Sequence, residues 1–595
     1  MSPLMKEANI HSLKILGIFG YLSLTLALLS VALGPLATGY EFSIYTALPI
    51  TFWTGLTTSF LLGVILNILS SNENRSYGGL GILLCSMSTL VLIIAPFLRG
   101  YVYMGQGDVL THVGYVRDLL SLSYTTYNVY PLEHIFTAAT IMASGTGVST
   151  AFTLIPIVFY FTGMSSVYAL VKVLNIGSIE KSLLPLLVLP IFGSYCYTFA
   201  PWLQSMFFMP VVFLTYLKYI SDGKPIMYLP MLIIIVVALV LYHPLAAVMA
   251  ALFFVLMEVA IRVEHYYSRK SGETEGVMRG HPIFVTALIG LIMIGWHPYY
   301  QAIIQIMNKT TEILKIGTSA SQSVNYATSL DPGTRIIEVI AYAGVRYFHI
   351  FLLLILILLG ALILRRAGDL CALSSKGFPT IIFLLLCTCS LVPFSLLFVF
   401  GFDLFNVERI ANTSLLLAIT FLLLVPWFRE SRRKWRKVLT KSCCFCLFAL
   451  ILSFSVINLY PSPMTLQANP QVTEQNMEGM DFIFQNRDKN IQIMEIGISQ
   501  YRYYDAILGV AAINNNIRFY SAVPNHFGYY KAEGDYNLHD SYIIITSQGR
   551  YLHEVVYPDF YEEWSFYPSD YSMFENDLNN IKIYDNRELL CYMYL

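Results

Sequence analysis

The sequence predicts a polytopic α-helical membrane protein with a small α/β domain at its C-terminal end. Hydrophobic residues make up 56% of its 595 residues and charged residues only 12%, about half the charged share of a soluble domain. Long apolar runs recur along residues 1–460, and a bilayer can cover apolar surface that one soluble core cannot. From residue 461 the chain becomes polar and alternates in the manner of strands. The net charge of -1 gives no indication of a nucleic-acid partner.

Apolar runs of about 20 residues are long enough to cross a bilayer, and the chain contains about thirteen of them. The first run is too long for the apolar part of a cleavable signal peptide, so we expect it to be a span. The two shortest runs, 183–199 and 283–297, are candidates for tilted or re-entrant segments. The candidate spans are residues 13–34, 49–69, 78–98, 148–171, 183–199, 203–219, 226–242, 244–262, 283–297, 346–364, 379–400, 411–428 and 442–460.

Lys and Arg gather in alternate loops, which predicts a cytoplasmic N-terminus in a multi-pass protein of the cell membrane. The loop before the last span adds a further basic group, namely Arg429, Arg432, Arg433, Lys434, Arg436, Lys437 and Lys441. Residues 1–460 then form the transmembrane domain and residues 461–595 an extracytoplasmic domain. In that outer domain the pattern predicts a helix near Thr473–Asn486, strands at Ile491–Ile496, Tyr542–Thr546 and Ile581–Tyr584, and a terminal hairpin turning at Asp-Asn-Arg.

The outer loop 99–147 is longer than a connection between spans requires, which indicates function. It is expected to form amphipathic helices on the membrane surface, with Leu119, Leu120, Leu122, Ile135 and Phe136 on their apolar sides.

The same loop carries the candidate catalytic residues Asp108, Glu133 and His134. Asp108 and His112 are four residues apart, so a helix would place both on one face. There they would hold a divalent metal such as Mg or Mn. Alternatively, the Asp108 carboxylate would act as a general base. The competing interpretation is that these groups are helix caps and interface anchors, and Arg117 with Asp118 is expected to form a solvated face.

Three further polar residues lie at the outer ends of predicted spans and are candidates for substrate binding. His243 lies in "LYHPLA", His297 in "GWHPYY" and Arg409 in "FDLFNVERIANTS". A cation at headgroup depth suits a phosphate or pyrophosphate, and ionisable groups at membrane depth are costly enough to indicate function. The alternative for each of the three is an ordinary interface anchor.

The stretch "GDVLTHVGYVRDLL…YPLEHI", together with "LYHPLA", "FNVERI" and "KIYDNRELLCYMY", resembles the C-type (GT-C) membrane glycosyltransferases. This family includes the protein mannosyltransferases, oligosaccharyltransferases and aminoarabinose transferases, and the similar members are uncharacterised archaeal and bacterial proteins. The resemblance implies that Asp108 matches the loop acid of the family, as base or metal ligand. It also implies that Glu133 or His134 matches the second polar site of that loop, and that Arg409 matches a cation for the lipid phosphate.

The chain departs from the family pattern in three respects. Three predicted spans, rather than one, precede the acid. The loop has Asp with His in place of an Asp-Asp or Asp-Glu pair. The oligosaccharyltransferase signature WWDYG is absent, which argues against N-glycan transfer to protein.

The resemblance implies a glycosyltransferase that moves a sugar from a polyprenyl-phosphate-linked donor to an acceptor at the outer membrane face, as part of glycosylation in the cell envelope. Its partners would be membrane lipid, the lipid-linked donor and an acceptor that is a protein, a glycan or a lipid. A transporter or flippase of a lipid-linked sugar is an alternative, although transporters place ionisable groups near the membrane midplane and often have repeated halves. A non-catalytic scaffold that displays the outer domain is the third hypothesis.

Overall fold

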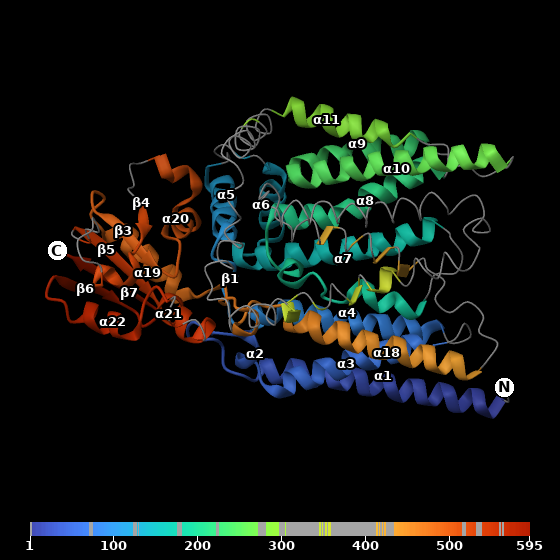
Figure 1. Ribbon diagram of the computed structural model, residues 1–595, viewed down its shortest axis with the longest axis horizontal. Helices are drawn as coiled ribbons and strands as arrows, with labels where there is room; N and C mark the ends of the chain where they lie inside the picture. The colour runs from blue at the N-terminus through green and yellow to red at the C-terminus, as the bar shows by residue number, and fades with distance from the viewer. Residues whose placement is uncertain are drawn as a thin grey trace.

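The computed structural model shows a helical bundle with the C-terminal domain at one end (Figure 1). The start of the chain lies at the opposite end of the bundle from this domain. The structure describes residues 3–70, 75–122, 128, 130–174, 181–221, 225–271, 281–296, 434–514, 519–530, 538, 540–558, 561 and 564–595, with scattered positions between 304 and 423.

The long helices of the bundle follow the apolar runs closely. Among the described residues, six helices are long and apolar enough to cross a membrane, so the prediction of a polytopic helical membrane protein is confirmed. Proline opens several of the helices, because its fixed φ and missing N–H suit the first turn. The helices are α1 (Pro3–Ala32), α3 (Ile50–Leu69), α4 (Arg75–Leu98), α7 (Val148–Leu174), α8 (Pro201–Ser221), α9 (Pro225–Tyr242), α10 (Pro244–Ser271), α11 (Ile283–Gly295) and α18 (Lys434–Ile457), with the short α2 (Ile44–Ala47) after α1.

The predicted span 183–199 is wrong. This run forms two short 3₁₀ helices, η1 (Lys181–Val188) and η2 (Gly193–Cys196), because Pro185 and Pro190 remove backbone donors that a continuous helix needs. Two of its carbonyl groups accept hydrogen bonds from buried hydroxyl groups of neighbouring helices. The Thr89 hydroxyl donates to the Val188 carbonyl at 2.5 Å, and the Tyr160 hydroxyl donates to the Leu189 carbonyl at 3.0 Å. Irregular backbone at membrane depth is tolerated when protein covers and satisfies it in this way.

The structure cannot be compared with every predicted span. The span 379–400 lies outside the described residues, and 346–364 and 411–428 are described only at isolated positions. The predicted substrate residues His297 and Arg409 also lie outside them.

The outer loop forms two helices, α5 (Asp108–Leu122) and α6 (Pro131–Ser144). Figure 1 shows both lying across the ends of the long helices, between the bundle and the C-terminal domain. Both predicted loop helices are present, and their large exposed apolar side chains are Leu122, Ile135, Phe136 and Met142. Leu119 and Leu120 are instead partly buried against a core shared with the C-terminal domain. The placement of the two helices on the membrane surface stays a prediction.

The C-terminal domain is a five-stranded mixed sheet with helices, as the sequence predicts. Its strand order is β4-β3-β5-β7-β6, with β4, β3 and β5 parallel and β7 and β6 antiparallel. The predicted terminal hairpin is β6–β7, and the Asp585 carboxylate accepts from the Arg587 N–H at 2.9 Å in its turn. The elements are β3 (Gln492–Ile496), β4 (Phe519–Ala522), β5 (Ser541–Thr546), β6 (Asn580–Asp585), β7 (Leu589–Tyr594), α19 (Glu474–Asn486), α20 (Gln500–Leu508), α21 (Ser547–Tyr551) and α22 (Pro568–Glu575), with the short helices η3 (Pro463–Thr465), η4 (Val510–Asn514), η5 (Asn525–Gly528) and η6 (Leu552–Val556).

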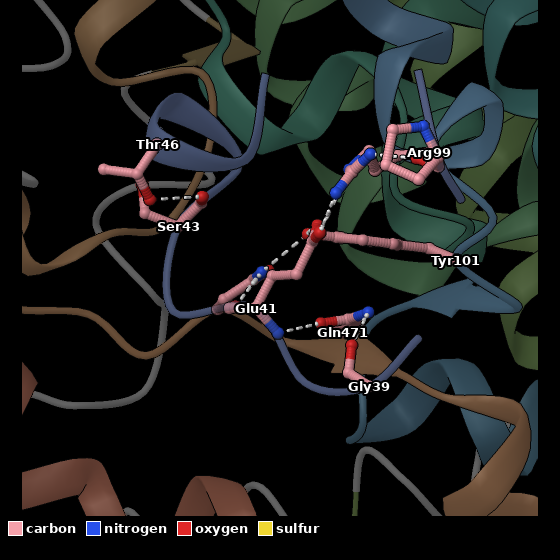
Figure 2. A network of polar contacts seen from close by, with 9 residues as sticks. Gly39, Glu41, Ser43, Thr46, Arg99, Tyr101 and Gln471 are labelled. Atoms are coloured by element: carbon pink, nitrogen blue, oxygen red, sulfur yellow. Dashed lines mark hydrogen bonds and ion pairs between the residues drawn. The ribbon is translucent and has the colours of Figure 1, made fainter. Parts of the chain in front are cut away.

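A polar neck joins the two halves of the protein (Figure 2). It centres on Glu41, whose carboxylate accepts from Arg99 at 2.6 Å and from the Tyr101 hydroxyl at 2.7 Å. Glu41 is also bound through its backbone, since its N–H donates to the Gln471 side chain and its carbonyl accepts from Asn469, both at 2.6 Å. Next to these contacts, β1 (Tyr103–Met104) pairs antiparallel with β2 (Gln471–Val472). The neck therefore fixes the segment after α18 to the loops that follow α1 and α4.

We expect Glu41→Gln to lower the stability of the whole protein, because the amide leaves the Arg99 cation without its partner at a site where both side chains are only 15–16% exposed. Loss of a charge-assisted hydrogen bond of this kind costs about 2 kcal/mol. Thermal unfolding in detergent micelles measures the change. The matched control is Lys582→Ala, whose ion pair is 40–48% exposed and for which about 0–1 kcal/mol is expected. Equal melting temperatures for the two variants would contradict a stabilising role for the neck.

Candidate functional site

Helix α5 has two polar faces, and they face different parts of the protein. One face carries His112, which is buried. Thr111 and Asp118 lie on a neighbouring face and contact the C-terminal domain, and Asp108, one turn before His112 on nearly the same face, also reaches that domain. The candidate site is built on both faces and on the start of α6.

A chain of hydrogen bonds runs through the buried histidines. The Asn128 amide nitrogen lies 2.8 Å from His134 Nδ1, and His134 Nε2 lies 2.9 Å from His112 Nδ1. Both imidazoles are fully buried, and burial lowers the pKa of His112 to about 4 and that of His134 well below its usual value. Both rings are therefore neutral at pH 7.

The direction of this chain follows from one backbone contact. The Tyr130 N–H donates to Asn128 Oδ1 at 3.0 Å, so the amide group of Asn128 directs its nitrogen towards His134. That nitrogen can only donate, so His134 Nδ1 accepts and its proton is on Nε2. His134 Nε2–H then donates to His112 Nδ1, which leaves the proton of His112 on Nε2. The chain thus ends in a directed neutral donor.

Glu133 is the most unusual group of the site. Its side chain is fully buried, and neither carboxyl oxygen has a hydrogen-bond partner among the described residues. Burial raises its pKa well above the usual value. A carboxyl group in such surroundings keeps its proton to a higher pH than an exposed one and can donate it in a hydrogen bond, and buried polar groups without partners call for an explanation of this kind.

Aromatic contacts connect this site to the ends of the membrane helices. Tyr130 stacks on His243 at 5.3 Å between ring centroids, and Trp202 meets the same histidine edge-on at 5.6 Å. His243 lies between α9 and α10, and Trp202 lies in the first turn of α8. The histidine pair, Tyr130 and His243 therefore form one group, where the bundle meets the outer loop helices.

Asp108 lies on the domain-facing side of α5, where it forms an ion pair with Arg502 of α20 at 2.5 Å. Arg502 also donates to the Thr111 hydroxyl at 2.7 Å, and that hydroxyl donates to Asp505 at 2.6 Å. The Asp108 side chain is 63% exposed, so a molecule arriving from outside the membrane can reach its carboxylate.

The arrangement does not fit a divalent metal at Asp108 and His112. Asp108 is paired with Arg502, and His112 Nδ1 accepts from His134. No group of three or more His, Cys, Asp or Glu side chains able to hold a metal ion occurs in the described parts of the chain. The predicted Mg or Mn therefore stays a prediction, and no step below uses it.

The structure thus groups four of the predicted site residues, His112, Glu133, His134 and His243, at the end of the bundle that meets the C-terminal domain. The expectation of a solvated face is wrong for Asp118, which is buried and accepts from the Ala511 N–H at 2.9 Å. Arg117 is exposed, as expected, but donates to the Ile507 carbonyl at 2.7 Å.

Sequence reasoning missed four residues of the site: Asn128, Tyr130, Trp202 and Arg502. Asn128 and Tyr130 directly precede Pro131, and polar residues just before a helix-opening proline were a usable signal. Arg502 carried no such signal, because its partner lies almost 400 positions earlier and only the docking of two domains joins them.

No protein-family model matches this sequence, and no curated protein matches it. Among solved structures, the chain is similar to ArnT from Cupriavidus metallidurans in the apo state, with 9% identity, a TM-score of 0.46 and coverage of 86% of this chain and 98% of that one. It is also similar to ArnT from the same organism bound to undecaprenyl phosphate, with 10% identity, a TM-score of 0.45 and the same coverage. The identity is too low for residues of the two proteins to be matched.

The protonated state of Glu133 predicts a specific pH dependence. Its pKa in the folded protein is above the unfolded value of 4.5, so it stabilises the fold fully below that pH and this contribution is lost as the pH rises towards the folded value. Glu133→Gln keeps the shape and does not ionise. We therefore expect the melting temperature of the variant to equal that of the wild type near pH 4.5 and to exceed it increasingly towards pH 8. A variant less stable than the wild type at pH 8 would show that Glu133 is ionised and paired.

Gly114 predicts how closely α5 must approach the C-terminal domain. A Cβ at this position would collide with the backbone carbonyl of Asp505 and would lie 3.0 Å from Val510 Cγ2. We expect Gly114→Ala to loosen the domain and to increase hydrogen exchange in α20. Gly147→Ala is the control, because a Cβ there meets nothing within 4 Å. Equal exchange in both variants would contradict close docking.

Proposed function

We propose that this protein is a glycosyltransferase that moves a sugar from a polyprenyl-phosphate-linked donor to an acceptor at the outer membrane face. The observation that carries the proposal is the buried, unpartnered carboxyl group of Glu133 beside a directed chain of neutral histidines, where membrane helices meet a soluble domain. The GT-C resemblance of the sequence agrees with this location.

The position of the site suits a donor that arrives through the bilayer. Leu122, Ile135, Phe136 and Met142 of α5 and α6 expose apolar surface next to the buried polar group. Helices of this kind lie at the interface between headgroups and acyl chains. A prenyl chain would stay in the bilayer, and its phosphate and sugar would enter between the outer ends of the helices.

Asp108 is the proposed proton acceptor. Its exposed carboxylate would take the proton from the hydroxyl or amine of the acceptor. The acceptor atom would then form a bond to the anomeric carbon of the sugar. The bond from that carbon to the phosphate oxygen would break, and the lipid phosphate would leave with the bonding electron pair.

The buried group is proposed to stabilise the departing phosphate. The neutral Nε2–H of His112 and the protonated carboxyl of Glu133 are fixed donors in dry surroundings, where a hydrogen bond to a developing negative charge has its largest effect. His243 is a candidate for the donor sugar, because its ring lies against Tyr130 and Trp202. Arg409 and His297 remain proposed ligands of the donor, at positions outside the described residues.

The test is a transfer assay with purified protein in nanodiscs. Radiolabelled polyprenyl-phosphate hexoses and aminoarabinose serve as donors, with a mixed pool of peptide, glycan and lipid acceptors. Asp108→Asn removes the base and should reduce transfer at least about 100-fold.

Asp481→Asn provides the control. Asp481 lies in α19 and accepts a hydrogen bond from Gln485 at 2.9 Å, so this variant loses one carboxylate away from the site and should keep full activity. Full activity in Asp108→Asn would overturn the assignment of the base. Movement of the lipid-linked sugar across vesicle membranes without any sugar transfer would show that the protein is a transporter and not a glycosyltransferase.

A further inference from the structure

The C-terminal domain contains a second group of aromatic and polar side chains that the proposed transfer reaction does not use. We call it the His526 cluster, and it consists of His526, Tyr530, Tyr561, Trp564, Tyr567 and Asp570.

The cluster occupies the part of the sheet where open α/β folds bind ligands. The parallel strands β4 and β5 flank β3 on opposite sides, so the chain changes direction at the carboxyl ends of these strands, and such a switch point is the usual ligand position. His526 follows the carboxyl end of β4 in η5. From the carboxyl end of β5 the chain enters α21 and η6, where the ring of His553 lies 6.2 Å from that of Trp564.

The carboxyl edge of the parallel strands also faces the membrane half. Helix α20 follows β3 and packs against α5, and η6 contacts η3 in the segment after α18. Tyr551 at the end of α21 meets Phe42 of the neck region edge-on at 5.6 Å.

The backbone at His526 is held in an unusual conformation. His526 and Phe527 have φ values of 54° and 52°, in the left-handed region that costs non-glycine residues free energy and that concentrates at functional sites. The surroundings fix this conformation, because the His526 N–H donates to the Ser565 carbonyl at 2.7 Å and the Phe527 ring stacks on Phe574 at 4.3 Å.

This backbone places the His526 ring beside a buried carboxylate. Asp570 is fully buried, and its Oδ2 lies 2.7 Å from His526 Nδ1 and accepts from the Tyr567 N–H at 2.7 Å. Because the carboxylate accepts, the proton of the neutral ring is on Nδ1 and the lone pair is on Nε2. Asp570 therefore fixes both the tautomer and the orientation of the imidazole.

Aromatic faces surround this imidazole. Tyr567 lies 4.6 Å and Tyr530 5.2 Å from the His526 ring, and Tyr561 stacks on Tyr567 at 4.8 Å. Tyr530 and Tyr561 are 58% and 54% exposed, so both present ring surface at the rim, and the Tyr530 hydroxyl lies within hydrogen-bonding reach of Asp570. Trp564 is buried below them, and its indole N–H is satisfied by the Tyr557 carbonyl at 2.8 Å.

We propose that the His526 cluster is a binding site for a neutral saccharide. One face of a pyranose ring consists of C–H bonds with partial positive charge, which complements the negative face of an aromatic ring. The oriented Nε2 atom of His526 and the hydroxyl of Tyr561 match the hydroxyl groups at the rim of the sugar. Among the described residues that form the cluster there is no Lys or Arg, which favours a neutral sugar over a phosphate. The proposal does not depend on glycosyl transfer.

Saturation-transfer NMR tests it, with the full protein in nanodiscs and the methyl pyranosides of glucose, galactose, mannose and N-acetylglucosamine as probes. We expect saturation of the pyranose ring protons of at least one probe. Tyr561→Ala and Tyr530→Ala remove exposed rings without opening a core cavity, and each should weaken binding about tenfold, equivalent to about 1.4 kcal/mol.

The chain offers a matched control for the loss of a stacked surface ring. Phe482 of α19 is 42% exposed and stacks on Tyr584 at 4.7 Å, and Phe482→Ala should leave binding unchanged. The proposal fails if no probe is saturated, if both tyrosine variants bind like the wild type, or if Phe482→Ala loses binding equally. Because no step of transfer is measured, saccharide binding can be present when the transfer assay fails, and absent when it succeeds.

Discussion

The docking of α5 between the membrane helices and the C-terminal domain determines the positions of the groups in the candidate functional site. One face of this helix buries His112 against His134, and the opposite face lies so close to α20 that Gly114 leaves no room for a side chain. Asp108, at the first turn, is held at the border between these two environments by Arg502. A shift of α5 would therefore disturb the buried histidines and the domain contact together, which couples the outer domain to the membrane site.

Two carboxyl groups, Glu41 and Glu133, lie where the bundle meets the C-terminal domain, and they affect the stability of the fold differently. The Glu41 carboxylate in the neck accepts charge-assisted hydrogen bonds from Arg99, and the Glu41 backbone contacts the segment after α18, so Glu41 stabilises the junction. Glu133 is buried without a hydrogen-bond partner in the described part of the chain, and burial raises its pKa, so its contribution to stability falls as the pH rises. Buried ionisable groups with a strongly shifted pKa occur mainly at functional sites. The partnered Glu41 is therefore interpreted as a structural contact and Glu133 as part of the candidate site.

The C-terminal domain contacts both the candidate site and the neck. Helix α20 supplies the cation that pairs with Asp108, and the same edge of the sheet carries the His526 cluster. In both places a side chain is oriented by a partner distant in sequence, Arg502 by Asp108 and His526 by Asp570. The domain thus contributes residues to the candidate site in addition to its contacts at the neck.

The sequence by itself determined the features that depend on local pattern and length. The apolar runs predicted most of the described membrane helices, because a span needs a fixed number of apolar residues, and Asp585 with Arg587 predicted the terminal hairpin through its turn chemistry. Local pattern also brought His112, Glu133, His134 and His243 to notice as polar groups in apolar surroundings. Only the tertiary structure showed that 183–199 is buried as 3₁₀ turns, that Asp118 is a domain contact and that Arg502 pairs with Asp108. These features depend on contacts between segments far apart in the chain, for which the pattern along one segment holds no information.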